Sequence, residues 1–310
     1  MHSLQQSMLM SLAYTSQFEY PLTPQELYTR LISSKSISVD QYQAALLTLI
    51  SQNYIQLISV EQQEFLVLKN AQQNYARTQT TTRLQRQAFS AKKWQEIIPI
   101  ITFLQFLPGI SGVLITGSLA MNNATKNDDV DFLIITKPHM LWILRPLVVG
   151  YSWIFGKRRS WQKEEKNSWC FNLWLDENHL QMPLQSRSIY TAYELYQAKW
   201  LVGMPQLVAS YYTQNSWAGT LLPQYSLQVA AQTIAALRQN SHVVLSLFTP
   251  LATLLSYLLA PFNVLLFLFQ HFYMLPHKTT ERVGYGYAFF HPRNTKQLIF
   301  TRWKEALLQL

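Results

Sequence analysis

The stretch that decides the fold is residues 114–136, LITGSLAMNNATKNDDVDFLIIT, in which two apolar runs enclose a polar segment. The first run ends at Gly117 and Ser118, and the second opens with two aspartates, Asp129 and Asp131, separated by one valine. Side chains alternate between the faces of a β-strand, so both aspartates should project from the same face. Two carboxylates this close repel each other, and a divalent cation would remove that conflict.

The Gly-Ser pair supplies the other half of a phosphate and metal site. A glycine between a strand and a helix lets backbone amides approach an anion, and the Ser118 hydroxyl adds a donor. Mg²⁺ suits Asp129 and Asp131 because it binds one or two carboxylates and completes its shell with water and substrate phosphates. The alternative is that Asp128 and Asp129 only cap the loop and that Asp131 meets a cation of the protein. An EF-hand is excluded, since its central glycine and final glutamate are absent.

An apolar strand, Gly-Ser, ten residues and Asp-Val-Asp in a second apolar strand resemble the signature of the DNA polymerase beta-like nucleotidyltransferase superfamily. The resemblance covers residues 100–200. It implies Mg-dependent transfer of a nucleoside monophosphate from an NTP to an acceptor, which is RNA, a small molecule or a protein. It further implies that Gly117 and Ser118 bind the nucleotide, and that Asp129 and Asp131 are catalytic ligands of two Mg²⁺ ions, with Mn²⁺ as an alternative. A domain of this fold that has lost catalysis and serves in regulation or nucleotide sensing is the competing hypothesis.

The third carboxylate of this family lies on a later strand. Our candidate for this catalytic, metal-binding residue is Asp176 in CFNLWLDENH, where Asn172, Trp174 and Asp176 should share a face of the strand. Glu177 is the alternative. We expect Glu194 to cap a helix, as the last residue of the capping box that begins at Thr191.

Several cations are candidates for contact with a triphosphate. Lys126 lies in the loop before the aspartates and Arg145 in the following helix, and we predict both as nucleotide-binding residues. The basic segment 157–159 could also neutralise phosphate, although helix-surface and loop cations are often only solvated. Asp128 should face away from its two neighbouring aspartates and act as a solvated turn residue.

Residues 1–70 are expected to form three helices and a hairpin. Capping boxes begin at Thr23 and Ser38, and YIQLIS and EFLVLK alternate as short strands around a polar turn. This order resembles the winged-helix family, whose third helix binds DNA. The third helix here contains no Lys or Arg, so we expect a protein contact or a packing role instead.

The expected fold class is α+β. The expected parts are a winged-helix-like module (1–70), a linker helix (71–100), a nucleotidyltransferase core with a small mixed sheet and flanking helices (101–200), and a helical apolar C-terminal region (201–310). The linker helix carries a row of Lys and Arg residues, which either faces solvent or faces nucleic acid.

Residues 243–275 contain no Asp, Glu, Lys or Arg. That length reaches the threshold for a membrane span, but two prolines interrupt it. We expect a buried helical hairpin in a largely soluble protein, with peripheral or re-entrant membrane association as the alternative.

The composition bounds the remaining classes. Hydrophobic residues make up 49% of the 310 residues, which excludes extended disorder. The single cysteine, Cys170, excludes an intrachain disulfide. The first residues lack the features of a secretory signal, so a cytoplasmic location is expected. The net charge of +9 favours polyanionic partners such as nucleotides, nucleic acid or anionic lipid.

Overall fold

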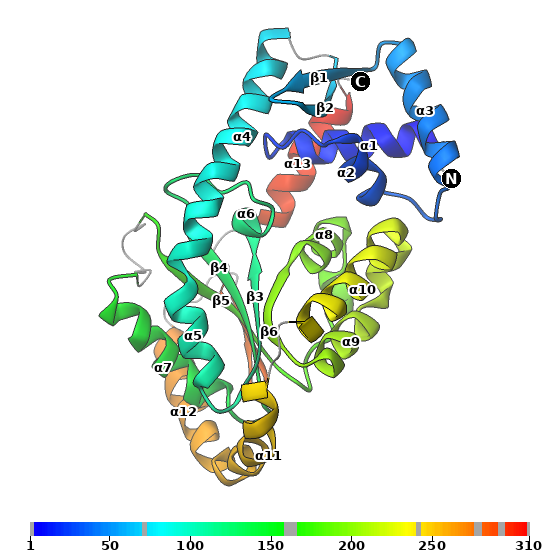
Figure 1. Cartoon of the computed structure of the whole chain (residues 1–310). Helices are drawn as coiled ribbons and strands as arrows, with labels where there is room; N and C mark the ends of the chain where they lie inside the picture. Colours follow the sequence, from blue (N-terminus) through cyan, green and yellow to red (C-terminus); the bar gives the residue numbers. More distant parts are fainter. Residues whose placement is uncertain are drawn as a thin grey trace.

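The computed structural model describes residues 3–69, 73–157, 166–239, 243–275, 281–290 and 295–308. Its elements, shown in Figure 1, are α1 (Leu4–Ser16), α2 (Pro24–Thr29), α3 (Val39–Ser51), β1 (Ile55–Val60), β2 (Gln63–Leu68), α4 (Gln73–Glu96), α5 (Ile98–Phe106), β3 (Ile110–Thr116), α6 (Gly117–Ala120), β4 (Val130–Thr136), α7 (Leu141–Ile154), β5 (Trp169–Asp176), η1 (Leu184–Ser186), α8 (Ile189–Gln197), β6 (Lys199–Gly203), α9 (Pro205–Gln214), η2 (Ser216–Thr220), α10 (Pro223–Gln239), α11 (Val243–Leu258), α12 (Ala260–Met274), β7 (Arg282–Gly284), β8 (Tyr287–Phe289) and α13 (Thr295–Leu308).

The N-terminal module consists of α1, α2, α3 and the antiparallel pair β1–β2. The predicted capping boxes are present, with Thr23 and Ser38 each accepting a hydrogen bond from a backbone N–H of the first helical turn. The hairpin turn places Glu61 and Gln62 at positive φ. The predicted helices and hairpin are therefore confirmed, while the resemblance to winged-helix proteins stays a prediction.

A mixed six-stranded sheet forms the centre of the molecule, in the order β6-β3-β4-β5-β8-β7. Strands β4 and β5 are parallel, and the other neighbours are antiparallel. The predicted α+β class and the mixed sheet with flanking helices are confirmed. Helices α9 to α13 make up most of the described part of residues 201–310, and β7 and β8, which the sequence did not predict, extend the sheet beyond β5.

The two faces of the sheet pack against different helices. Phe132 and Ile134 of β4 belong to the core cluster that includes residues of α5 and α7. Leu133 and Ile135 belong to the cluster on the opposite face, which includes residues of α8, α9 and α13. Alternation along the strand therefore places Asp131 on the α8 face.

Helix α4 runs along the side of the molecule from the N-terminal module to the sheet (Figure 1). Its cations largely face protein. Arg83 is buried and pairs with Glu26 at 2.8 Å, Arg86 pairs with Glu19, and Lys93 is also buried. These three cations do not form the solvated or nucleic-acid-facing row considered from the sequence.

The apolar stretch folds into α11 and α12, and the expected buried hairpin is wrong. Many of the large apolar side chains of the described residues 250–275 are exposed, among them Phe269 at 71%. Within the described chain, no helix alone has the length and hydropathy for a membrane span. The segments Pro250–Leu258 and Ala260–Met274, bent by 63°, meet that test only when taken together.

Candidate functional site

The candidate site lies at one end of the β3–β4 pair. The antiparallel register sets Thr116 opposite Asp131, so the Gly-Ser turn and the second aspartate meet there. Gly117 has a φ of +64°, a left-handed conformation that favours glycine. A Cβ on Gly117 would lie 2.6 Å from Oδ2 of Asp131. The glycine is therefore required both by its backbone conformation and by the close approach of the carboxylate.

Asp131 is oriented by β5. Nδ2 of Asn172 donates to its Oδ1 at 3.0 Å. Asn172 is 4% exposed, and its own Oδ1 is buried without a hydrogen-bond partner among the described residues. A buried amide oxygen with no partner is uncommon. The Oδ1 atom of Asn172 therefore has lone pairs that no described residue uses.

Asp129 is held by the segment that enters β5. Its Oδ1 accepts hydrogen bonds from the backbone N–H of Ser168 at 3.0 Å and from the Ser168 hydroxyl at 2.8 Å. The carbonyl of Ser168 in turn accepts from the N–H of Val130 at 2.9 Å. The start of β5 thus fixes the first aspartate, and Ser168 is a positioning residue that sequence analysis missed.

Asp128 organises the loop between α6 and β4. Its carboxylate accepts from the Ser118 hydroxyl at 3.1 Å, from the Thr125 N–H at 2.9 Å and from the Thr125 hydroxyl. The expectation of a solvated turn residue is wrong. Ser118 therefore uses its hydroxyl to connect the Gly-Ser turn to the aspartate segment.

Lys93 reaches the same loop from α4. Its Nζ donates to the Asp128 carbonyl at 2.7 Å and to Oδ1 of Asn167 at 2.6 Å. Burial lowers the pKa of Lys93, and the acidic groups around it oppose that effect. This lysine ties together the segments that precede β4 and β5. The sequence gives no signal of this role, because Lys93 is one of several Lys and Arg residues along α4.

Glu194 of α8 completes the surroundings of the Gly-Ser turn. Its carboxylate accepts a hydrogen bond from the Gly117 N–H, while burial and the negative charge of Asp131 raise its pKa to about 7. The negative charge of Glu194 in turn raises the pKa of Tyr190. The expected capping role is wrong, because Ser188 caps α8 by accepting from the Thr191 N–H.

The family comparison agrees with this geometry. Residues 97–177 match the family model described as the nucleotidyltransferase domain. The chain contains a nucleotidyltransferase domain. Comparisons with curated proteins and with solved structures found no match. The matched segment runs from the start of α5 to just past β5, so it includes both aspartates but not α8.

Asp176 does not join the aspartate pair of the nucleotidyltransferase domain. The parallel register sets it opposite Thr136, five residues along β4 from Asp131, which corresponds to roughly 16 Å of strand. A bulge in β5 also changes the facing of its later residues. Trp174 consequently packs in the core cluster of the α7 face, and alternation puts Asp176 on that face. The expected third ligand is therefore wrong, and Asp176 instead accepts from His179 at 2.6 Å.

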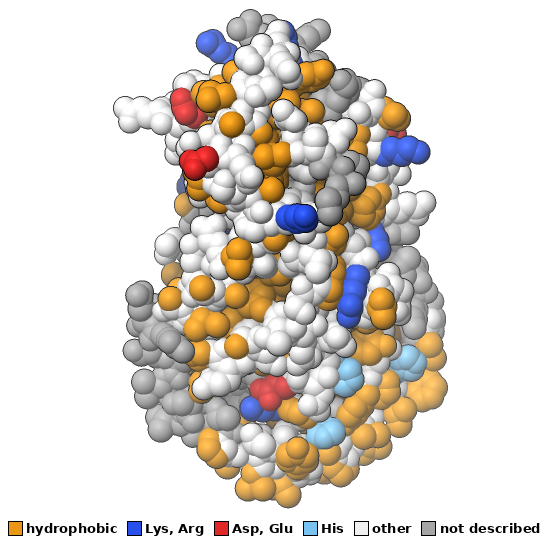
Figure 2. All heavy atoms as spheres, turned by 90° about the vertical axis from the view of Figure 1, so that its right-hand side faces the viewer, with side chains coloured by type: hydrophobic (Ala, Val, Ile, Leu, Met, Phe, Trp, Pro, Cys, Tyr) orange, Lys and Arg blue, Asp and Glu red, His pale blue; other side chains and the backbone are white. Residues whose placement is uncertain are grey.

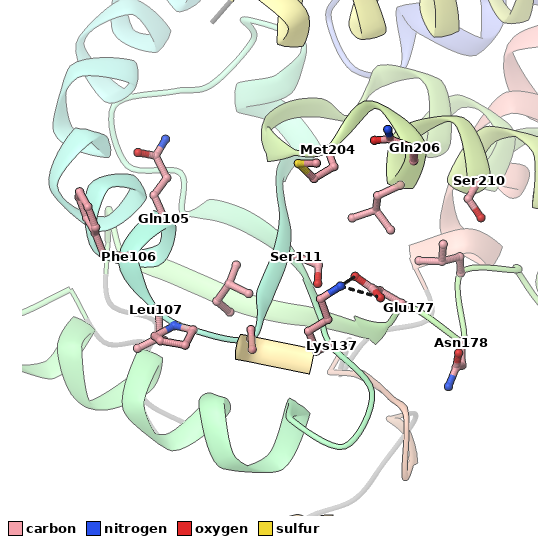
Figure 3. A pocket seen from close by; sticks show the side chains of 16 residues that line it. Gln105, Phe106, Leu107, Ser111, Lys137, Glu177, Asn178, Met204, Gln206 and Ser210 are labelled. Atoms are coloured by element: carbon pink, nitrogen blue, oxygen red, sulfur yellow. Dashed lines mark hydrogen bonds and ion pairs between the residues drawn. The ribbon is translucent and has the colours of Figure 1, made fainter. Parts of the chain in front are cut away.

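Glu177, the alternative third carboxylate, also lies at the distant end of the sheet. It forms an ion pair with Lys137 at 2.9 Å. The pair lines a cavity of about 450 Å³ at the end of the sheet where β3 starts, as Figure 3 shows. The buried hydroxyl of Ser111, which has no partner among the described residues, lines the same cavity.

The predicted phosphate-binding cations are dispersed. Lys126 is exposed in the loop before the aspartates, a position compatible with substrate contact. Arg145 points to the opposite side, where it donates to Gln270 at 2.7 Å and lies over the Phe290 ring. It does not reach the Gly-Ser turn. Lys157 pairs with Glu96 at 3.3 Å, and the other two residues of the predicted basic segment, 158 and 159, lie outside the described residues.

The side chains present offer a metal ion two carboxylates, those of Asp129 and Asp131. Within the described ranges, no three His, Cys, Asp or Glu side chains are arranged to hold a metal. Both aspartates lie at the end of β4 where the Gly-Ser turn is found, and Asn172 orients Asp131. Mg²⁺ accepts two carboxylates when water and substrate phosphates supply the remaining ligands.

Proposed function

We propose that this protein is a Mg-dependent nucleotidyltransferase that transfers a nucleoside monophosphate from an NTP to an acceptor. The observation that carries the proposal is the contact between Gly117 and Asp131. A glycine in the left-handed conformation and a carboxylate, separated by 14 positions in the sequence, lie against each other at the end of two paired strands. The family match over residues 97–177 supports the general chemistry.

The chain's own residues would position the substrate and the metal. Asp129 and Asp131 would hold Mg²⁺, which when bound neutralises charge on the transferring phosphoryl group. The Gly117 turn leaves room for a phosphate because it has no side chain. Ser168 and Asn172 orient the two carboxylates before substrate arrives, which reduces the reorganisation required for catalysis.

A non-catalytic role in nucleotide sensing is the second candidate. The observation that favours it is Asn172, a neutral residue on β5 beside Asp131, where the family resemblance leads us to expect a third carboxylate. Glu194 also lies near Asp131, but it belongs to helix α8 and not to a strand. The two candidates agree on nucleotide binding and differ only in turnover.

The test measures NTP binding and product formation for Asp129→Asn and Asp131→Asn with Mg²⁺ present. Each change removes a negative charge from the carboxylate pair, so turnover should fall by roughly two or more orders of magnitude. The matched control is Asp40→Asn on the exposed start of α3, which should behave like the wild type. Asp176→Asn should also keep its turnover, because that residue lies at the other end of the sheet.

Each outcome decides between the candidates. Mg-dependent NTP binding by the wild-type protein, with no transfer to RNA, protein or small-molecule acceptors, supports the sensing role. Transfer that is unaffected by both aspartate changes would contradict the proposed site itself.

A further inference from the structure

Helix α12 directs its polar side chains toward the protein. Oδ1 of Asn263, which is fully buried, accepts hydrogen bonds from the N–H groups of Trp142 at 2.9 Å and Ile143 at 3.3 Å, at the start of α7. Gln270 donates to the Trp142 carbonyl at 2.9 Å and accepts from Arg145. The polar residues of α12 thus satisfy the backbone and a cation of α7.

The opposite face of α12 is entirely apolar and exposed. Its large side chains are each at least 42% exposed and recur at the spacing of one helical face: Phe262, Val264, Leu265, Leu268, Phe269, Phe272 and Tyr273. A helix at a water-facing surface has the reverse arrangement, with its apolar stripe inward and its charged residues outward. In this helix the amphipathic pattern is inverted.

The described part of α11 repeats the inversion. Ser256 is buried and bonds within its helix, and Ala252 is also buried. Its exposed side chains are apolar: Leu251, Leu254, Tyr257 and Leu258. We call the exposed apolar side chains of α11 and α12 the apolar cap.

We propose that the apolar cap docks on a lipid bilayer, with α11 and α12 lying in the interface rather than crossing it. The inverted pattern is the first reason, since lipid is the environment in which an outward apolar face is favourable. The cap also includes Tyr257 and Tyr273, and Tyr side chains are enriched where a membrane meets water. A net charge of +9 makes an anionic bilayer the preferred surface.

The shape of the cap argues for a fluid partner. Segments Pro250–Leu258 of α11 and Ala260–Met274 of α12 meet at an angle of 63°, and both helices lie at one pole of the molecule (Figure 1). Figure 2 shows hydrophobic side chains around that pole, away from the N-terminal module. A convex, bent surface fits a deformable interface more readily than one flat face of a second copy.

Docking would also orient the candidate site. Asp131 lies at the end of β4 near α6, whereas the start of α7, where α12 is anchored, follows the opposite end of β4. The cap would therefore hold the Gly-Ser turn away from the lipid. This orientation rests on the proposed function, whereas docking itself does not.

Flotation of the full chain with vesicles tests the proposal. The wild-type protein should float with vesicles of phosphatidylcholine and phosphatidylglycerol, and less with phosphatidylcholine alone. The triple variant Leu265→Gln, Phe269→Gln and Phe272→Gln should partition at least about tenfold more weakly, because burial of three large apolar side chains is lost. These residues are exposed, so folding should persist, and circular dichroism checks that.

The control replaces three equally exposed apolar residues outside the cap: Leu47→Gln, Leu184→Gln and Leu227→Gln. It should float like the wild type. Failure of the wild-type protein to float with either vesicle overturns the proposal. Flotation of the cap variant to the same extent as the wild type also overturns the proposal, because binding would then depend on charge alone. A wild-type dimer in solution that the cap variant abolishes, without flotation, would identify a second copy as the occupant.

Discussion

Gly117→Ala tests the glycine that brings the turn against Asp131. This substitution has two distinct effects, one on the backbone and one on the neighbouring carboxylate. Left-handed backbone costs a residue with a Cβ about 1–2 kcal/mol, and this cost applies wherever φ is positive. The second effect is local, because the new Cβ would lie 2.6 Å from Asp131 Oδ2, whereas ordinary contact begins at 3.4 Å. The carboxylate would have to move by about 0.8 Å, a displacement that can reduce turnover roughly 100-fold.

Gly156→Ala is the matched control for this prediction. Gly156 follows α7 with a φ of +61°, and nothing lies within 4 Å of its added Cβ. Both variants should lose about 1–2 kcal/mol of unfolding free energy in urea, while only Gly117→Ala should lose Mg-dependent transfer. Equal transfer by both variants and the wild-type protein would refute the role of the Gly117–Asp131 contact.

Three further changes probe the residues that sequence analysis misjudged. Asp128→Asn should lower the unfolding free energy by about 1–3 kcal/mol, because the carboxylate accepts three hydrogen bonds; wild-type urea stability would contradict this. Lys93→Met leaves the Asp128 carbonyl and the Asn167 amide oxygen without their donor, and should cost a similar amount by the same measurement. Above the pKa of about 7, where Glu194 is ionised, Glu194→Gln replaces an anionic acceptor at the Gly117 N–H with a neutral one, so NTP should bind about fivefold more tightly by calorimetry. Weaker or unchanged NTP binding would show that Glu194 does not compete with phosphate.

The aspartate pair and the Gly-Ser turn were predictable because they depend on local pattern. One short loop separates β3 from β4, and antiparallel pairing of consecutive strands brings its ends together. The strand period then places Asp129 and Asp131 without knowledge of any other element. The capping boxes of the N-terminal module were predictable for the same reason, since each spans only four residues.

The positions of the remaining site residues depend on strand register and on packing between segments that are distant in the sequence. Alternation along an unbroken strand predicts that Asp176 shares a face with Asn172, but the β5 bulge ends that alternation. Glu194 is far from Gly117 in sequence, and only the docking of α8 brings them together. The wrong prediction at α12 has a different cause. An apolar composition predicts burial, whereas the polar residues of α12 face the protein and its large apolar residues face outward.

The structural surroundings of the Gly-Ser turn extend beyond the segment that matches the family. The match ends at residue 177, yet the Gly117 N–H is held by Glu194, and β3 pairs on its outer side with β6. A backbone N–H carries one hydrogen, so under the proposed function Glu194 would compete with a substrate phosphate for the same donor. Helix α8 would thereby influence how the Gly-Ser turn meets a nucleotide. Because Tyr14 of α1 stacks on the neighbouring Tyr193 at 4.5 Å, the N-terminal module can affect the same helix.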